Sequence, residues 1–260
     1  MKTTALTMGI QSLKELLIKK TVFHPMPSTF ITARPDVACS YLAEGYILLL
    51  VDNSPFALVL PCSIFHFTQT PEDYYKSPLV GTYTRIVRLL CFLISLFLMP
   101  LFLLFCLNPQ WLPSFLTGLI PDDVNRTAIF VYALFVEFGL DLFKYASAHS
   151  ASAFSGSFAI VGGLLLGDMA VSLKWTNEEV IFYGAATLLA SLGISNVELS
   201  DAVKMYRLLL VLLTGFFSPW GFFVGLGLIF LSLITTPVFG GKHYLWPLFP
   251  FDWKALRTLL

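Results

Sequence analysis

The sequence predicts a mainly α-helical, multi-pass membrane protein with a short α/β N-terminal region that contains a β-hairpin. Composition is the first observation: 57% of the 260 residues are hydrophobic and 12% are charged, a balance unusual for a soluble domain. The second is length, because several apolar runs reach the roughly 20 residues that a helix needs to cross the hydrocarbon core. The third is a net charge of zero, so no basic field indicates nucleic acid as a partner.

Residues 1–80 are predicted to be soluble or interfacial. Ser12 and Glu15 are spaced as a capping box, which favours a short amphipathic helix. The stretch 46–61, YILLLVDNSPFALVLP, is apolar, but Asp52-Asn53-Ser54-Pro55 divides it into two runs too short to span a membrane. These four turn residues predict that 46–61 is a β-hairpin.

Residues 81–238 are predicted to form a transmembrane helical domain. Its clearest spanning helix runs from Arg85 to Leu107. Arg85 and Arg88 at the start of this helix favour a cytoplasmic N-terminal side, and Pro100 predicts a kink.

The next apolar segment, 127–148, carries three charged residues. Glu137, Asp141 and Lys144 are spaced i, i+4 and i+7, so a helix would place them on one face. A charge facing hydrocarbon is unfavourable, so these groups are expected to face water or a neighbouring protomer. Two placements remain open: the helix spans with its charged face turned inward, or it lies in the interface with that face wet.

Two further apolar segments are rich in small residues, which allow helices to approach closely. The first, 158–173, contains a GxxxG pair and one acid, Asp168, that has no local partner of opposite charge. The second, 179–195, aligns Gly184, Thr187 and Ser191 on one side. Both segments are slightly short for spanning, so a re-entrant or tilted hairpin is the predicted arrangement.

The last apolar run, 206–236, exceeds one membrane thickness. Thr214, Ser218, Gly221 and Gly225 fall on one helical face, and this register continues past Pro219. We therefore expect one bent or tilted helix here.

The tail, 239–260, has an interfacial composition with Trp246 and Trp253 beside basic residues. Lys/Arg residues stand at both ends of the last apolar run: Lys204 and Arg207 at its start, and Lys242, Lys254 and Arg257 after it. A single span between them cannot satisfy the preference of both groups for the cytoplasm.

No catalytic motif is present: the sequence contains no Walker loop, HExxH or GxSxG pattern. The four histidines are scattered, and none of the four cysteines forms a CxxC pair. The sequence therefore predicts no enzyme, no metal site and no cofactor, and cysteines that are buried as small hydrophobic residues.

Six blocks, in order along nearly the whole chain, resemble the GerA family of spore germination receptor A subunits. The blocks are ARPDV (33–37), EGYILLLVDNSPFALVLP (44–61), FTQTPEDYY (67–75), GTYTRIVRLLCFLISLFLMPLF (81–102), IVGGLLLGD (160–168) and SNVELSDAVKMYRLLL (195–210). ARPDV, the Gly167-Asp168 pair and the tail YLWPLFPFDWKAL most resemble a branch of the family associated with stage V of sporulation.

The resemblance implies a multi-pass protein of the spore inner membrane that acts with other germination membrane proteins. It also implies a homo-oligomeric, cation-releasing channel. Family members carry a large soluble domain ahead of the hairpin, and most of that domain is absent here, so residues 1–80 are expected to be its remnant.

Three functional hypotheses follow. The first is a subunit of a germination-associated cation channel or channel-like amplifier. The second is a non-conducting membrane scaffold for receptor assembly, and the third is a secondary transporter, which is weakened by the lack of an internal inverted repeat. The candidate ion-path residues are Glu137, Asp141, Lys144, Asp168, Thr214 and Ser218. The candidate helix-packing residues are Gly156, Gly163, Gly167, Gly221 and Gly225.

Overall fold

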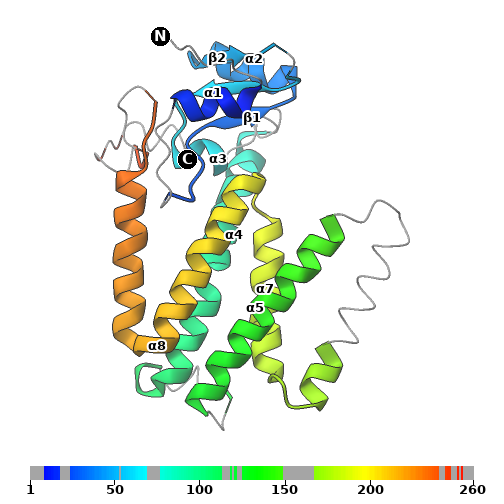
Figure 1. Ribbon diagram of the computed structural model, residues 1–260, viewed down its shortest axis with the longest axis vertical. Helices are drawn as coiled ribbons and strands as arrows, with labels where there is room; N and C mark the ends of the chain where they lie inside the picture. Colours follow the sequence, from blue (N-terminus) through cyan, green and yellow to red (C-terminus); the bar gives the residue numbers. More distant parts are fainter. Residues whose placement is uncertain are drawn as a thin grey trace. The chain divides into compact units, whose positions relative to one another are not determined.

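The computed structural model of the chain separates into two compact units, and each is described by itself (Figure 1). The first unit comprises Met1–Leu89, Ile194–Ala202 and Ile229–Leu260, and the second comprises Leu90–Gly193 and Val203–Leu228. The structure describes residues 9–17, 24–52, 54–68, 77–112, 118, 120–121, 125–148, 167–239, 244–246, 251 and 253.

The first unit contains a three-stranded antiparallel sheet. Its strands are β1 (Phe30–Thr32), β2 (Ile47–Leu50) and β3 (Ala57–Leu60), in the order β1-β3-β2. The pair β2 and β3 forms the hairpin expected within 46–61, with Leu48 opposite Val59. The central strand β3 is buried along its whole length, as both of its edges are paired. The sequence analysis missed β1, a strand of three residues.

Three short helices accompany the sheet: α1 (Ile10–Leu17), α2 (Pro35–Ala43) and α3 (Ile64–Thr68). α1 begins two residues before Ser12, so the capping-box pattern does not mark its start. α2 begins with proline at its first position, where the missing N–H leaves no unsatisfied donor. Aromatic rings join α2 and α3 to β1, with ring centroids 5.3 Å apart for Phe30 and Tyr41 and 6.0 Å apart for Phe30 and Phe67.

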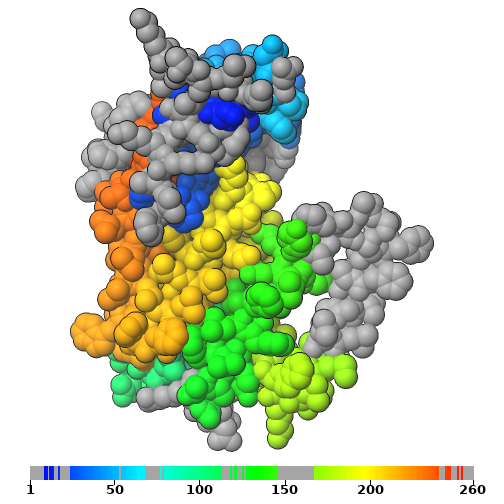
Figure 2. All heavy atoms as spheres, viewed as in Figure 1, coloured from blue at the N-terminus to red at the C-terminus, as the bar shows by residue number. Residues whose placement is uncertain are grey.

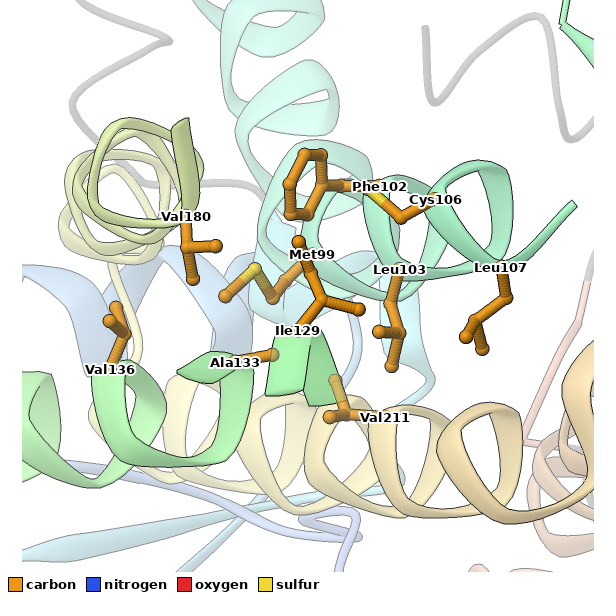
Figure 3. Packing of buried hydrophobic residues seen from close by; sticks show 10 residues of the cluster. All are labelled: Met99, Phe102, Leu103, Cys106, Leu107, Ile129, Ala133, Val136, Val180 and Val211. Atoms are coloured by element: carbon orange, nitrogen blue, oxygen red, sulfur yellow. The ribbon is translucent and has the colours of Figure 1, made fainter. Parts of the chain in front are cut away.

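The second unit is helical. Its core is formed by parts of α4 (Pro78–Leu107), α5 (Arg126–Ala148), α7 (Glu178–Leu192) and α8 (Val197–Thr235). Figure 3 shows this cluster, whose buried members are Met99, Phe102, Leu103, Cys106, Leu107, Ile129, Ala133, Val136, Val180 and Val211. The fold is thus mainly α-helical with a small antiparallel sheet, as the sequence predicts.

The small-residue face of α7 packs against α5. Gly184, Thr187 and Ser191 are buried, and a Cβ atom at Gly184 would lie 2.4 Å from Cγ1 of Val136. Both hydroxyls donate back to carbonyls of their own helix, Thr187 to Tyr183 and Ser191 to Leu188. With these donors satisfied inside α7, its polar residues tolerate an apolar neighbour.

Two helices among the described residues, α4 and α8, are long and apolar enough to cross a membrane. Many of their large apolar side chains are exposed, and Figure 2 shows part of this surface on α8 (yellow to orange). α4 continues past Pro100 without a break.

We expected α8 to be one bent or tilted helix. It is instead a hairpin of two helical arms. Ser218 has φ 53° and ψ −132°, which interrupts the helix before Pro219. The second arm returns along the first: a Cβ at Gly225 would lie 2.7 Å from Cδ2 of Leu210, and a Cβ at Gly221 would lie 1.9 Å from the carbonyl oxygen of Leu213. The two arms appear in Figure 1 as neighbouring antiparallel helices.

The compact units interleave along the chain. α4 and α8 each contribute to both units. The first unit contains the start of α4 together with residues 194–202 and 229–260, which include both ends of α8. The hairpin in α8 explains this grouping, because its second arm runs back along the first and brings the end of α8 near its start.

Candidate functional site: a buried ion pair between three helices

The charged residues of α5 meet charged residues of the first arm of α8. The guanidinium group of Arg207 donates from Nη2 and Nε to Oε2 of Glu137, at 2.8 and 3.0 Å. Nη1 of Arg207 also donates to the carbonyl oxygen of Ser95 in α4 at 3.0 Å, and lies 3.3 Å from Oγ of Ser95. One side chain therefore connects α4, α5 and α8.

A second ion pair lies one helical turn away. Nζ of Lys204 is 2.9 Å from Oδ1 of Asp141. The side chains of Lys204 and Asp141 are 32% and 27% exposed, whereas those of Arg207 and Glu137 are 5% and 3% exposed. One ion pair of the cluster is thus partly exposed to solvent, and the other is buried.

Helical spacing accounts for this arrangement. Residues 204 and 207 are three apart on α8, and residues 137 and 141 are four apart on α5, so each pair projects from one side of its helix. The contacts join 204 to 141 and 207 to 137, which is the register of two antiparallel helices. The charged face of α5 is therefore turned toward α8, where Glu137 and Asp141 pair with Arg207 and Lys204 of the same chain.

The carboxylate of Glu137 is only partly satisfied. Both bonds from Arg207 go to Oε2, and Oε1 is buried without a hydrogen-bond partner among the described residues. A buried carboxylate oxygen strongly favours a donor or a cation, because desolvation of an ionised carboxylate is unfavourable. Oε1 is therefore the oxygen of this carboxylate that lacks a donor, and a water molecule or a cation at this position would satisfy it.

The cluster holds its helices in one register. Arginine remains charged at all ordinary pH values, and its planar fork matches a carboxylate. Separating Arg207 from Glu137 would leave two opposite charges in an apolar environment, which is strongly unfavourable. Sliding of α5 along α8 is therefore opposed unless water or ions reach both groups.

The other predicted ion-path residues lie outside this cluster. Lys144 is half-buried on α5, and Asp168 is exposed in a helical segment that covers residues 167–172. Thr214 is buried two turns beyond Arg207 on α8, and its Oγ1 has no hydrogen-bond partner among the described residues. Ser218 forms the turn of the α8 hairpin, where its Oγ accepts a hydrogen bond from Nδ2 of Asn108 at 3.1 Å.

The five predicted packing glycines differ in their surroundings. Gly221 and Gly225 lie at the close approach of the two arms of α8. A Cβ atom at Gly167 would meet nothing within 4 Å among the described residues. Gly156 and Gly163 lie outside the described residues.

Arg207, Lys204 and Ser95 are not among the site residues predicted from the sequence, where the two basic residues indicate only topology. Lys204 and Arg207 in KMYRLLL are opposite in charge to Glu137 and Asp141, and both pairs have a spacing close to one helical turn. This pattern could have identified the partners. Ser95 contributes mainly a backbone carbonyl, which no residue pattern reveals.

A second buried polar group lies in the first unit. His66 has its Nδ1 3.0 Å from the backbone N of Ser63 and 2.8 Å from Oγ of the same residue, while its Nε2 contacts the hydroxyl of Tyr46. Since Nδ1 accepts the backbone N–H, the ring serves to cap the start of α3 and to join it to β2. Within the described ranges, no three His, Cys, Asp or Glu side chains are grouped to hold a metal ion.

The cysteines are free and differ in exposure. Cys62 and Cys106 are buried, as expected for small hydrophobic residues, and Cys91 is partly buried. Cys39 is exposed on α2, which contradicts the expectation of burial. Its position on the outer side of a short surface helix accounts for the difference.

Comparison with known proteins identifies relatives along the whole chain. The family model described as Bacillus/Clostridium GerA spore germination protein matches residues 1–260. The chain is 30% identical to Stage V sporulation protein AF of Bacillus subtilis, over 98% of this chain and 51% of that protein. It is 26% identical to Spore germination protein KA of Bacillus subtilis, over 95% of this chain and 46% of that protein.

A relative from a second species is Spore germination protein GerIA of Bacillus cereus, 31% identical over 86% of this chain and 33% of that protein. The chain thus spans about half the length of the first two relatives and a third of this one. No solved structure matches the chain.

Proposed function

Because the chain belongs to the GerA spore germination protein family, we propose that it is a membrane subunit of an oligomeric, germination-associated cation channel or channel-like amplifier. The site of action is the inner membrane of a bacterial spore. Its partners are the lipid bilayer, further copies of itself and other germination membrane proteins. The names of the relatives, which are spore germination and sporulation proteins, support this assignment.

The observation that carries the proposal is the buried carboxylate of Glu137. It lies among apolar helices with one oxygen bonded to Arg207 and the other buried without a hydrogen-bond partner among the described residues. Ionisable residues inside membrane domains typically mark ion or proton pathways. In this proposal, Asp141 and Lys204 at the partly exposed end of the cluster lie between water and Glu137.

A multi-pass arrangement is part of the proposal. α4 and both arms of α8 cross the apolar layer, and the ion pairs join α5 to the first arm of α8. Because the ionised groups of α5 face α8, the helix presents apolar residues such as Val131, Phe135 and Phe138 outward. That outward face is compatible with lipid or with a neighbouring protomer.

The test is cation flux through liposomes that contain the purified full-length protein. We expect release of potassium or sodium, and we expect Glu137→Gln to change the rate at equal protein incorporation. Glu198→Gln is the matched control, because Glu198 is an exposed acid that pairs with Lys14 at 3.4 Å. Asp168→Asn tests the exposed acid of residues 167–172 in the same assay.

A non-conducting scaffold is the second candidate, and the Arg207 contact favours it. An acid that is already paired within its own chain attracts cations less than an unpaired one, and the three-helix connection stabilises a rigid unit. Liposomes without flux, made with protein that still binds its germination partners, would support the scaffold and reject the channel. Flux that is identical in the wild type and Glu137→Gln would reject the assigned role of Glu137.

A further inference from the structure

The turn of the α8 hairpin carries a cluster of exposed aromatic side chains. We call this cluster the aromatic turn, and it comprises Phe216, Phe217, Trp220 and Phe223, which are 71%, 65%, 77% and 54% exposed. The turn itself contains no charged residue, and none occurs between Arg207 and Lys242. Exposed rings of this size are unfavourable in water, so the aromatic turn requires an apolar or amphipathic partner.

The end of α4 lies beside the aromatic turn. Asn108, directly after α4, donates to Oγ of Ser218 at 3.1 Å and to the carbonyl of Leu104 at 3.1 Å. Trp111 lies near Phe223, with ring centroids 6.4 Å apart. The end of α4 and the turn of α8 are therefore at the same level of the helical unit.

Both ends of α8 lie together at the other end of its arms. Residues 194–202 and 229–260 belong to one compact unit, which also contains the first residues of α4. The first arm, residues 197–217, is about 30 Å long at 1.5 Å per residue. That length equals the thickness of the hydrocarbon core, so the turn and the two ends of α8 match opposite faces of one bilayer.

Basic residues are distributed unequally between these two levels. The stretch from Asn108 to Asn125, which follows α4, contains no Lys or Arg, and neither does the aromatic turn; one basic residue, Arg126, follows the stretch at the start of α5. Arg85 and Arg88 lie near the start of α4, Lys204 lies about two turns into the first arm of α8, and Lys242 follows α8 in the sequence. Basic residues favour the cytoplasmic side of a membrane, which in a spore is the core side.

We propose that the aromatic turn, together with Trp111, is an interaction surface for the headgroup layer of the outer leaflet, and that α8 enters and leaves the bilayer through the inner leaflet. Tryptophan suits this layer because its ring is apolar and its N–H is polar. The uncharged Ser218–Asn108 contact provides polar groups at the same depth. This proposal does not depend on channel activity, since a scaffold would be anchored in the same way.

The proposal also resolves a conflict in the sequence. Lys204 and Lys242 both favour the cytoplasm, but a single span between them would place them on opposite sides. A hairpin returns the chain to the side of the membrane from which it entered, so one cytoplasmic side satisfies the preference of both basic stretches of the sequence.

Cysteine accessibility in membrane vesicles of known orientation tests the path of α8. The variants are Glu198→Cys and Thr235→Cys, at exposed positions near the two ends of α8, and Gln110→Cys, at an exposed position after α4. Each is made in full-length protein that carries Cys39→Ser, and the parent without an added cysteine gives the background. We expect a membrane-impermeant maleimide to label positions 198 and 235 from the cytoplasmic side and position 110 from the other side.

Labelling of positions 198 and 235 from opposite sides would overturn the proposed path of α8. Labelling of both from the outer side would overturn the assigned orientation. These outcomes do not depend on ion flux, so they are distinguishable from a failure of the proposed channel function.

Fluorescence quenching by brominated lipids tests the lipid partner. The difference between the wild-type and Trp220→Phe spectra isolates the emission of Trp220. We expect stronger quenching by bromine near the headgroups than by bromine near the end of the acyl chains. Equal and weak quenching by both lipids would reject the lipid surface. If the protein is self-associated at the dilution used, that result would assign the aromatic turn to a contact between copies of the chain.

Discussion

Arg207 of α8 donates two hydrogen bonds to a single oxygen of Glu137 in α5 and a third to the carbonyl oxygen of Ser95 in α4. The two charged side chains lie 70 positions apart in the sequence and are almost completely buried. A buried ion pair is not in itself a strong source of stability, because the loss of hydration offsets much of the attraction. The pair instead fixes which helices pack together, because either charge alone would be buried without a partner of opposite charge.

Removing one partner is therefore expected to destabilise the protein much more than removing both. Glu137→Ala should destabilise the protein by about 3–5 kcal/mol, since it leaves the guanidinium group buried without its carboxylate. The double variant Glu137→Leu with Arg207→Met should recover most of that loss, as two apolar side chains replace the pair. Thermal unfolding in detergent, followed by circular dichroism, measures both. A double variant less stable than Glu137→Ala would contradict this account.

The neighbouring pair of Lys204 and Asp141 should behave differently. It is about one-third exposed, so Lys204→Met should change stability by only about 0.2–1 kcal/mol. Salt screens exposed charges more than buried ones, so the effect should decrease when the salt concentration is raised. The same unfolding assay at low and high salt checks this, with Arg207→Met as the comparison. An effect of Lys204→Met as large and as salt-independent as that of Arg207→Met would contradict the difference in burial.

The hairpin in α8 depends on a close backbone approach at Gly221. A Cβ atom there would lie 1.9 Å from the carbonyl oxygen of Leu213, and backbone cannot move aside as a side chain can. Gly221→Ala should destabilise the protein by about 1–3 kcal/mol, the range typical of overpacking. Gly227→Ala is the matched control, because a Cβ at Gly227 meets nothing within 4 Å. Equal melting temperatures for the two variants would show that the arms do not approach as described.

The turn residue Ser218 has a positive φ of 53°, which favours glycine and disfavours β-branched residues. In a regular helix, glycine is the worse substitution, at about 1 kcal/mol below alanine. We expect the opposite order at position 218, where Ser218→Val should be less stable than Ser218→Gly. Leu228, an exposed position in the second arm, provides the comparison, and there Leu228→Gly should be the less stable of the two variants. The same order at both positions would mean that Ser218 has an ordinary helical conformation.

The cysteines of the first unit should differ in reactivity. Burial raises the pKa of the Cys62 thiol to about 12, so almost none of it is thiolate at pH 8. Cys39 is exposed on α2. A maleimide should therefore modify Cys39 in the folded protein within minutes and reach Cys62 only after denaturation, as peptide mass spectrometry can follow. Fast modification of Cys62 under native conditions would indicate that the sheet and α3 do not enclose it.

Some features of this protein follow from the sequence alone. The alternation of apolar runs and turn residues determined the hairpin of β2 and β3, and the length of the apolar runs determined α4 and the apolar nature of α8. These patterns are local, because a strand or helix needs only its own residues to define its period. The blocks that resemble the GerA family are local in the same sense, and the family match over residues 1–260 agrees with them.

The tertiary structure alone decided which charged residues meet. The spacing of Glu137 and Asp141 defined a charged face of α5, but not that Arg207 and Lys204 lie against it. The same is true of the reversal at Ser218, since a helical register that continues past Pro219 fits both a bent helix and a hairpin. In each case the deciding interaction joins groups that are distant in the sequence, and its free energy depends on burial that exists only when the helices are packed.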